Sequence, residues 1–232
     1  MGNQNLQPSE VDRLIGGQPQ NIPQALDVST EQQLGVYAPQ ELREIPAPIR
    51  FSFDERKAAS AASFLLHLAG GKMKYLRLIK LLYFADRDSL DALGQPITGD
   101  RYVSMKHGPV LSEVYDLVKR VTFGRQGHGP WAESIEGFDR YSVQLKRGPD
   151  LGPLSEAERE ILEGVFARYR DRDSWRLRDE SHDLPEWQDP GASSREILVE
   201  EILQVLGKSE AEIEQIRQRA AEKLHFDRIF GK

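Results

Sequence analysis

Apolar side chains recur at helical spacing through most of the chain after residue 50. Between residues 53 and 68 they stand three and four positions apart, which predicts an amphipathic helix, and Gly70-Gly71 ends it. A second apolar stripe runs over residues 72–93 and stops at Gly94, so a longer helix is expected there. The folded part therefore begins with two helices joined by a short glycine turn.

The periodicity then changes from helical to alternating. Residues 97–107 alternate polar and apolar side chains, which predicts an extended strand, and Gly108 interrupts it. Pro109 is expected to open the next helix, because the N–H that proline lacks has no partner in a first helical turn. Residues 141–145 alternate again and are expected to pair with 101–106 in a small sheet.

The C-terminal third contains Ser-x-x-Glu sequences that are typical of helix starts. They begin at Ser155, Ser193 and Ser209, where serine and glutamate can bond each other's backbone N–H groups in a capping box. Trp175 indicates a further short helix before a turn over residues 181–187. The helices predicted here cover residues 155–170, 173–180, 194–206 and 209–224.

These elements predict a mainly α fold of the α+β class. We expect a compact helical domain over residues 51–190 with a small antiparallel sheet of two or three strands. Residues 191–232 are expected to form a C-terminal helical extension packed on that domain. A chain of 232 residues is long enough to bury such a core without disulfides or metals.

Residues 1–50 differ from the rest of the chain. They contain no lysine, almost half of the prolines and only scattered apolar residues, which disfavours a packed core. We expect a flexible or extended N-terminal arm. It is either a solvated tail or a segment that becomes ordered when it binds a partner.

Composition narrows the function classes. The chain has no cysteine, so it has no disulfide, zinc–thiolate site or thiol nucleophile. The net charge of −6 argues against nonspecific nucleic-acid binding, which needs a basic surface. No apolar run approaches the ~20 residues of a membrane-spanning helix. We therefore expect a cytoplasmic protein with no membrane contact.

The sequence contains no recognised catalytic or metal-binding motif. No two histidines stand at metal-ligating spacing on one predicted element, and the nucleophile-elbow and phosphate-loop motifs are missing. The glycine-rich residues 124–130 lack the strand–loop–helix context of a phosphate site, so a mobile loop is the preferred interpretation. We predict no catalytic residue, no metal and no cofactor.

Basic residues follow one side of the second predicted helix. Lys74, Arg77, Lys80 and Arg87 form this flank, and such stripes are usually solvated faces. A helix-turn-helix over residues 53–91 would instead use Lys72, Lys74, Arg77 and Lys80 as phosphate contacts. This alternative is disfavoured because the helix offers tyrosine and leucine where a DNA-reading helix offers polar side chains.

His107 stands directly before the expected start of a helix. There it could hold an anion beside Lys106, because unpaired N–H groups gather at a helix N-terminus. The alternative is a histidine at the end of a strand, bonded to nearby backbone. Both interpretations stay open.

Three separated motifs stand out in the folded part of the chain. They are Lys80-Leu81-Leu82-Tyr83-Phe84-Ala85, then Lys106-His107-Gly108-Pro109-Val110 with Tyr115, then Ser181-His182 with Pro185-Glu186-Trp187. In this order they resemble the Panacea domain, the domain of SocA-type antitoxins and phage-associated GepA-type proteins. The resemblance covers roughly residues 53–190, with His107 standing where the family often has tyrosine.

The resemblance implies an antitoxin of a toxin–antitoxin system. Such a protein is not an enzyme and neutralises a cognate protein toxin by direct protein–protein binding. A proteolytic adaptor that delivers the toxin to a ClpXP-type protease is the alternative, and a DNA-binding autorepressor is a weaker one. A homo-oligomer is left open.

The resemblance also carries over candidate toxin-binding or motif residues. Gly108 and Pro109 are best explained by backbone geometry. The motif side chains Lys80, Tyr83, Lys106, His107 and Tyr115 are expected to face a partner. The arm and the last two helices are expected to supply toxin specificity. The full set of motif positions is Lys80, Tyr83, Lys106, His107, Gly108, Pro109, Tyr115, His182 and Trp187.

Overall fold

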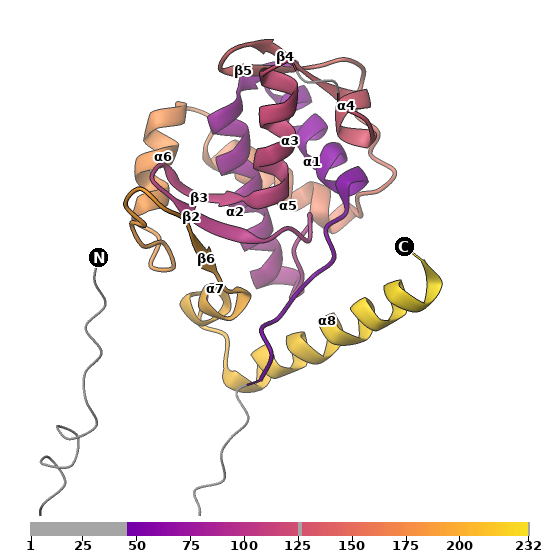
Figure 1. Ribbon diagram of the computed structural model, residues 1–232, viewed down its shortest axis with the longest axis vertical. Helices are drawn as coiled ribbons and strands as arrows, with labels where there is room; N and C mark the ends of the chain where they lie inside the picture. Colours follow the sequence, from indigo (N-terminus) through magenta and orange to yellow (C-terminus); the bar gives the residue numbers. More distant parts are fainter. Residues whose placement is uncertain (1–45, 125–126, 232) are drawn as a thin grey trace, which may run out of the picture. The chain divides into compact units, whose positions relative to one another are not determined.

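The computed structural model describes residues 46–124 and 127–231 (Figure 1). Within them, eight helices and two three-stranded antiparallel sheets confirm the predicted mainly helical α+β class. The helices are α1 (Glu55–Leu68), α2 (Tyr75–Leu93), α3 (Ser112–Thr122), α4 (Pro130–Ser134), α5 (Glu156–Arg168), α6 (Ser174–His182), α7 (Val199–Val205) and α8 (Glu210–Phe230). The strands are β1 (Lys72–Lys74), β2 (Tyr102–Met105), β3 (Gly108–Leu111), β4 (Ile135–Asp139), β5 (Ser142–Leu145) and β6 (Arg195–Ile197). The predicted arm falls, up to residue 45, outside the described residues.

Helix α2 is the centre of the fold. Every residue from Leu78 to Asp86 on it is buried, so this helix is covered on all sides rather than along one stripe. Helices α1, α5 and α6 and strand β3 contact it, and Figure 1 shows it running through the middle of the domain. Any polar side chain on these two and a half turns must therefore find its partner inside the protein.

The two sheets lie on different parts of this helical core. One has the strand order β1-β5-β4 and the other β3-β2-β6. The predicted pairing of residues 141–145 with 101–106 is therefore wrong. Alternation identified both strands, but it cannot choose partners, and here buried Met73 of β1 faces buried Val143 of β5.

The second predicted helix starts three residues later than expected. Residues 72–74 form β1, and α2 begins at Tyr75. A strand this short shows no alternation that could be separated from the helical stripe behind it. Lys72 and Lys74 point outward from the strand while Met73 is buried.

Pro109 lies in a strand and not at the start of a helix. It stands opposite Ser104 in the β2–β3 hairpin, and α3 begins only at Ser112. Strand β3 is at the edge of its sheet, where a residue without an N–H is tolerated. His107 consequently lies in the hairpin turn, and the helix N-terminus expected beside it does not exist.

Two of the three predicted capping boxes are present. Ser155 and Ser209 each accept a hydrogen bond from the N–H three residues on, and the glutamate there bonds back. The box predicted at Ser193 is wrong, because residues 195–197 form β6 and α7 begins at Val199. Strand β6 pairs with β2, which lies about ninety residues earlier in the chain, and Ile197 stands opposite Tyr102.

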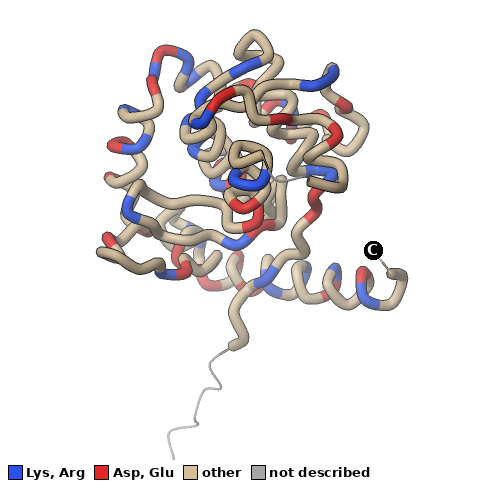
Figure 2. The backbone as a smooth tube through the Cα atoms, turned by 45° about the horizontal axis from the view of Figure 1, so that its top comes forward, with Lys and Arg blue, Asp and Glu red and all other residues tan. Residues whose placement is uncertain are grey.

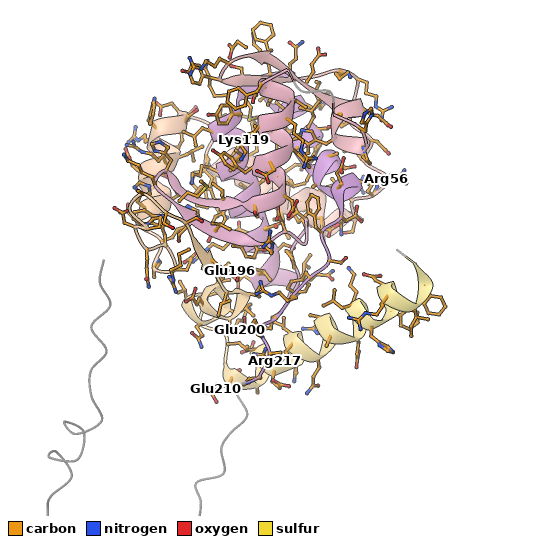
Figure 3. The ribbon with its side chains drawn as sticks, viewed as in Figure 1. Arg56, Lys119, Glu196, Glu200, Glu210 and Arg217 are labelled. Carbon is orange, nitrogen blue, oxygen red and sulfur yellow. The ribbon has the colours of Figure 1, made fainter. Side chains whose placement is uncertain are left out.

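A polar cluster attaches the first described residues to the C-terminal helices. The Glu200 carboxylate accepts hydrogen bonds from the Ile49 N–H and from the Arg217 guanidinium, each at 2.8 Å. Figure 3 shows Glu196, Glu200 and Arg217 following one another from β6 through α7 to α8. Ile49 is buried beside them, so residues 46–50 pack against the described core.

Candidate functional site

The nine motif residues separate into an interior group and a surface group. Lys80 belongs to the interior: it is fully buried on α2, and its Nζ donates to the Pro109 carbonyl at 2.6 Å. Burial lowers the Lys80 pKa to about 7. The expectation that Lys80 faces a partner is therefore wrong, because every polar atom of this side chain is turned toward β3.

Gly108 makes this contact possible. Its φ of +84° is a conformation that residues with a side chain rarely adopt. A Cβ at this position would lie 2.2 Å from Ser181 Oγ and 2.6 Å from Lys80 Nζ. The missing side chain of Gly108 therefore lets Lys80 of α2 and Ser181 of α6 approach β3 closely.

Tyr83 is buried as well, and the expectation that it faces outward is wrong. Its hydroxyl donates to Glu186 Oε1 at 3.1 Å, and Arg87 Nε donates to the same oxygen at 2.8 Å. Burial raises the pKa of the Tyr83 hydroxyl well above its ordinary value. The Glu186 carboxylate, itself buried, links α2 to the turn after α6.

The third motif forms the turn that follows α6. The His182 and Trp187 rings are stacked with centroids 4.0 Å apart, and Trp187 Nε1 donates to the Met105 carbonyl at 3.1 Å. Burial, followed by the positive charge of Lys80, lowers the His182 pKa. We call the six buried or turn-forming positions the motif core: Lys80, Tyr83, Gly108, Pro109, His182 and Trp187.

The other three motif residues border an open groove of about 690 Å³. Lys106 and His107 are exposed in the β2–β3 turn, and Tyr115 is half-buried on α3. The floor and walls come from α2, the hairpin, α3, the β4–β5 turn and the start of α6. The remaining lining residues are Lys74, Tyr75, Leu76, Ile79, Met105, Val110, Tyr141, Asp173, Ser174 and Trp175. We call this surface the aromatic groove.

Two exposed aromatic side chains stand in the groove. Trp175 is 57% exposed and Tyr141 54% exposed, although side chains of this size are usually well covered. The His107 and Trp175 rings meet edge to face with centroids 6.2 Å apart. Sequence reasoning used Trp175 only to indicate a helix and Tyr141 only to begin a strand. The one sequence feature that could have indicated an exposed Trp175 is its place in a short, otherwise strongly polar helix.

The basic flank predicted on α2 is only partly exposed. Lys80 is buried, and the Arg77 guanidinium donates to the carbonyls of Tyr169 and Arg170, at 3.3 and 2.9 Å. Two of the four proposed phosphate contacts are thus turned inward. The other two, Lys72 and Lys74, are exposed.

The lining of the aromatic groove is mixed in chemistry. Its lining offers aromatic faces, aliphatic side chains and a few cations, which suit a complementary surface. No cluster of three or more potential metal-ligating side chains occurs in residues 46–124 and 127–231. Within the same ranges, no helix has the length and apolar character needed to cross a membrane.

Comparison with known proteins identifies the domain that carries these features. A family model described as "Antitoxin SocA-like, Panacea domain" matches residues 78–188. No curated protein and no solved structure matches the chain significantly. The matched segment begins on α2, ends just after Trp187 and contains all nine motif positions. A SocA-like Panacea domain is therefore found at residues 78–188 of this chain.

Proposed function

We propose that this protein is an antitoxin that neutralises a cognate protein toxin by direct binding, and that the aromatic groove contacts the toxin. The antitoxin-like domain supports the general role. The observation that carries the proposal is the gathering of the three surface motif residues with two exposed aromatic side chains around one groove.

Exposed aromatic side chains are the usual anchors of protein–protein interfaces. Tryptophan and tyrosine bury a large apolar area with few rotatable bonds, and they dominate the binding energy where they are covered. Trp175 and Tyr141 would each lose solvent exposure on binding, while Ile79 and Val110 already form a buried apolar floor. A partner side chain could enter the groove without burying an unpaired charge on this floor.

Co-expression tests the function. The full-length protein is produced together with the protein encoded next to its gene, with growth of the host as the readout. We expect the neighbouring protein to arrest growth alone and this protein to restore it. A neighbouring protein that is harmless alone, or equally toxic in both conditions, contradicts the proposal.

A matched pair of variants tests the groove. Trp175→Ala should weaken toxin binding at least tenfold in Kd and reduce rescue of growth, since a central anchor typically contributes about 2 kcal/mol or more. Phe123→Ala is the control, because Phe123 is 62% exposed and lies outside the groove lining. Circular dichroism of both variants checks that they fold. Equal binding by both variants would remove the groove from the proposal.

The toxin's half-life separates blocking from delivery to a protease. Direct neutralisation leaves the half-life unchanged or longer when this protein is present. An adaptor for a ClpXP-type protease shortens it, and loss of the protease then restores toxicity. Pulse-chase labelling of the toxin measures the difference.

A further inference from the structure

A second hollow adjoins the aromatic groove. It has a volume of about 490 Å³ and lies between the end of α1, β1, α2 and the segment that joins α5 to α6. Lys74, Asp173 and Ser174 line both hollows, so the two form one continuous surface. We call this surface the extended groove.

The extended groove is rich in cations that have no acidic partner. Lys72, Lys106 and Arg170 are exposed and pair with no carboxylate of the described residues. Arg77 donates only to neutral carbonyl groups. Lys74 has one distant carboxylate, Asp139, at 3.8 Å. Burial lowers the pKa of Arg77 while the nearby Asp171 carboxylate acts to raise it, so the cations without a carboxylate partner on this surface are Lys72, Lys106 and Arg170.

Only one acidic residue lines either hollow, and it is already engaged. Asp173 is the N-cap of α6, and its Oδ1 accepts hydrogen bonds from the N–H groups of Trp175 and Arg176, at 2.9 and 2.8 Å. This carboxylate stabilises the helix that carries Trp175. It therefore positions Trp175, and its single charge is outnumbered by the exposed cations Lys72, Lys106 and Arg170.

The positive charge of the extended groove is local and does not follow from the net charge of the chain. The whole chain has 37 acidic and 31 basic residues, and Figure 2 shows the two kinds interspersed along most elements. Cations elsewhere are often paired, as Arg101 is with Glu113 and Arg147 with Glu133, each at 3.3 Å. In the extended groove, the unpaired cations Lys72, Lys106 and Arg170 share one surface with the exposed rings of Trp175 and Tyr141.

From this combination we propose that the extended groove binds an acidic segment of the toxin, in which carboxylates alternate with aliphatic or aromatic side chains. The carboxylates would meet Lys72, Arg170 and Lys106, and the apolar side chains would cover Trp175 and Tyr141. Opposite charges across an interface select the partner and speed its association. The inference rests on the proposed function and adds the chemistry of the segment that is recognised.

A nucleic acid fits this surface less well. Binding to a phosphate backbone depends on a basic footprint over a domain whose overall charge does not oppose it. Here the net charge is −6, and the floor between the cations is aliphatic, formed by Leu76, Ile79 and Val110. Apolar side chains between the charges match a protein segment, whose side chains can alternate in the same way.

Charge reversal tests the inference on the full-length protein. The first variant combines Lys72→Glu with Arg170→Glu. The control combines Arg120→Glu with Lys223→Glu, which changes the net charge equally at two exposed cations outside both hollows. The binding probes are the purified toxin and three labelled ligands: a short peptide alternating glutamate with leucine and phenylalanine, its glutamine counterpart, and a single-stranded oligonucleotide of equal charge.

We expect the groove variant to lose at least tenfold in affinity for the toxin and for the acidic peptide, and the control variant to lose less than threefold. The glutamine peptide should bind at least tenfold more weakly than the acidic one. Unchanged toxin affinity in the groove variant overturns the inference, as does an oligonucleotide that binds where the acidic peptide does not.

The two proposals fail in different ways. If no toxin is neutralised by the wild-type protein, the proposed function is wrong, while the peptide experiment still reports on the groove. If the toxin is neutralised equally well by the wild type and the Lys72→Glu, Arg170→Glu variant, the function stands and the inference about the groove is wrong.

Discussion

At the scale of single residues, Gly108 shows how a family motif can be a packing requirement. Its missing side chain lets Lys80 of α2 and Ser181 of α6 reach the same point on β3. The lysine amine then bonds the Pro109 carbonyl inside the protein. The Gly108-Pro109 pair of this motif therefore supports the fold. The preceding residues Lys106 and His107 are exposed.

Gly108→Ala should lower the free energy of unfolding by at least about 3 kcal/mol, because its Cβ overlaps two side chains in addition to straining the backbone. Gly70→Ala is a close control: its φ of +82° nearly equals that of Gly108, and nothing lies within 4 Å of the added Cβ. It should cost only about 1 kcal/mol. Urea denaturation measures both, and equal losses would contradict the steric explanation.

Lys80 should make stability rise with pH above neutrality. Its pKa is about 7 in the folded protein and 10.5 ordinarily, so between these values the unfolded chain binds more protons. From pH 7 to about pH 9 this adds about 2 kcal/mol to the free energy of unfolding. Lys80→Met should remove that rise.

The measurement is the difference between wild type and Lys80→Met in urea denaturation at several pH values. Asp86 has the opposite effect on stability, because burial raises its pKa to about 7. Its contribution to the free energy of unfolding therefore falls as pH rises from about 4 to 7. This contribution is present in both proteins and cancels in the difference. Lys223→Met, at an exposed position, should leave the profile unchanged.

At the scale of secondary-structure elements, the motif core joins α2 to segments that follow it by up to a hundred residues. Glu186 in the turn after α6 receives hydrogen bonds from Tyr83 and Arg87 of α2. Trp187 in the same turn bonds the Met105 carbonyl of β2. These bonds hold α6, and with it Trp175, at the edge of the aromatic groove.

Glu186→Ala should destabilise the protein by about 3 kcal/mol, because it leaves the partly buried Arg87 guanidinium and the Tyr83 hydroxyl without their acceptor. Glu186→Gln should lose less stability, since its amide oxygen can still accept the hydrogen bond from the Tyr83 hydroxyl. Glu180→Ala is the control: its pair with Arg172 is about one-third exposed, and its loss should stay below about 1 kcal/mol. Equal effects at Glu180 and Glu186 in urea denaturation would argue against the link.

Most helices could be predicted from the sequence, and so could strands β2 and β5, but strands β1, β3 and β6 could not. The capping boxes at Ser155 and Ser209 act within four residues, so they work as the sequence alone suggests. Strands β1 and β6 are three residues long and pair with strands far along the chain, whereas β3 is four residues long and forms a hairpin with the preceding strand β2. Local periodicity cannot show such partners, and the predicted helix starts at Lys72, Pro109 and Ser193 failed for this reason.

At the scale of the whole molecule, α8 belongs to the core only over its first half. Ile213, Ile216 and Ala220 are buried there, whereas Phe226 and Phe230 near its end are more than 60% exposed. In Figure 1 its last turns run clear of the other elements. The stability of the described domain should therefore depend on the first half of this helix alone.

Removing residues 221–232 should change the free energy of unfolding by less than about 1 kcal/mol, because the apolar side chains lost are exposed in the folded state too. Removing residues 207–232 should cost at least about 4 kcal/mol, since it also deletes buried Ile213 and Ile216 and the Arg217–Glu200 ion pair. Thermal and urea unfolding compare the two truncations. A large loss from the shorter one would show that the end of α8 packs on the domain.

The sequence by itself determined the helical class, most helix positions and the presence of a Panacea domain. Each of these depends on local periodicity, capping or residue order, which the chain carries without reference to its fold. Tertiary structure alone decided that Lys80 and Tyr83 face inward, and that Trp175 and Tyr141 join Lys106, His107 and Tyr115 at one groove. Whether a side chain is buried depends on segments far along the chain, and only the packed molecule brings those segments together.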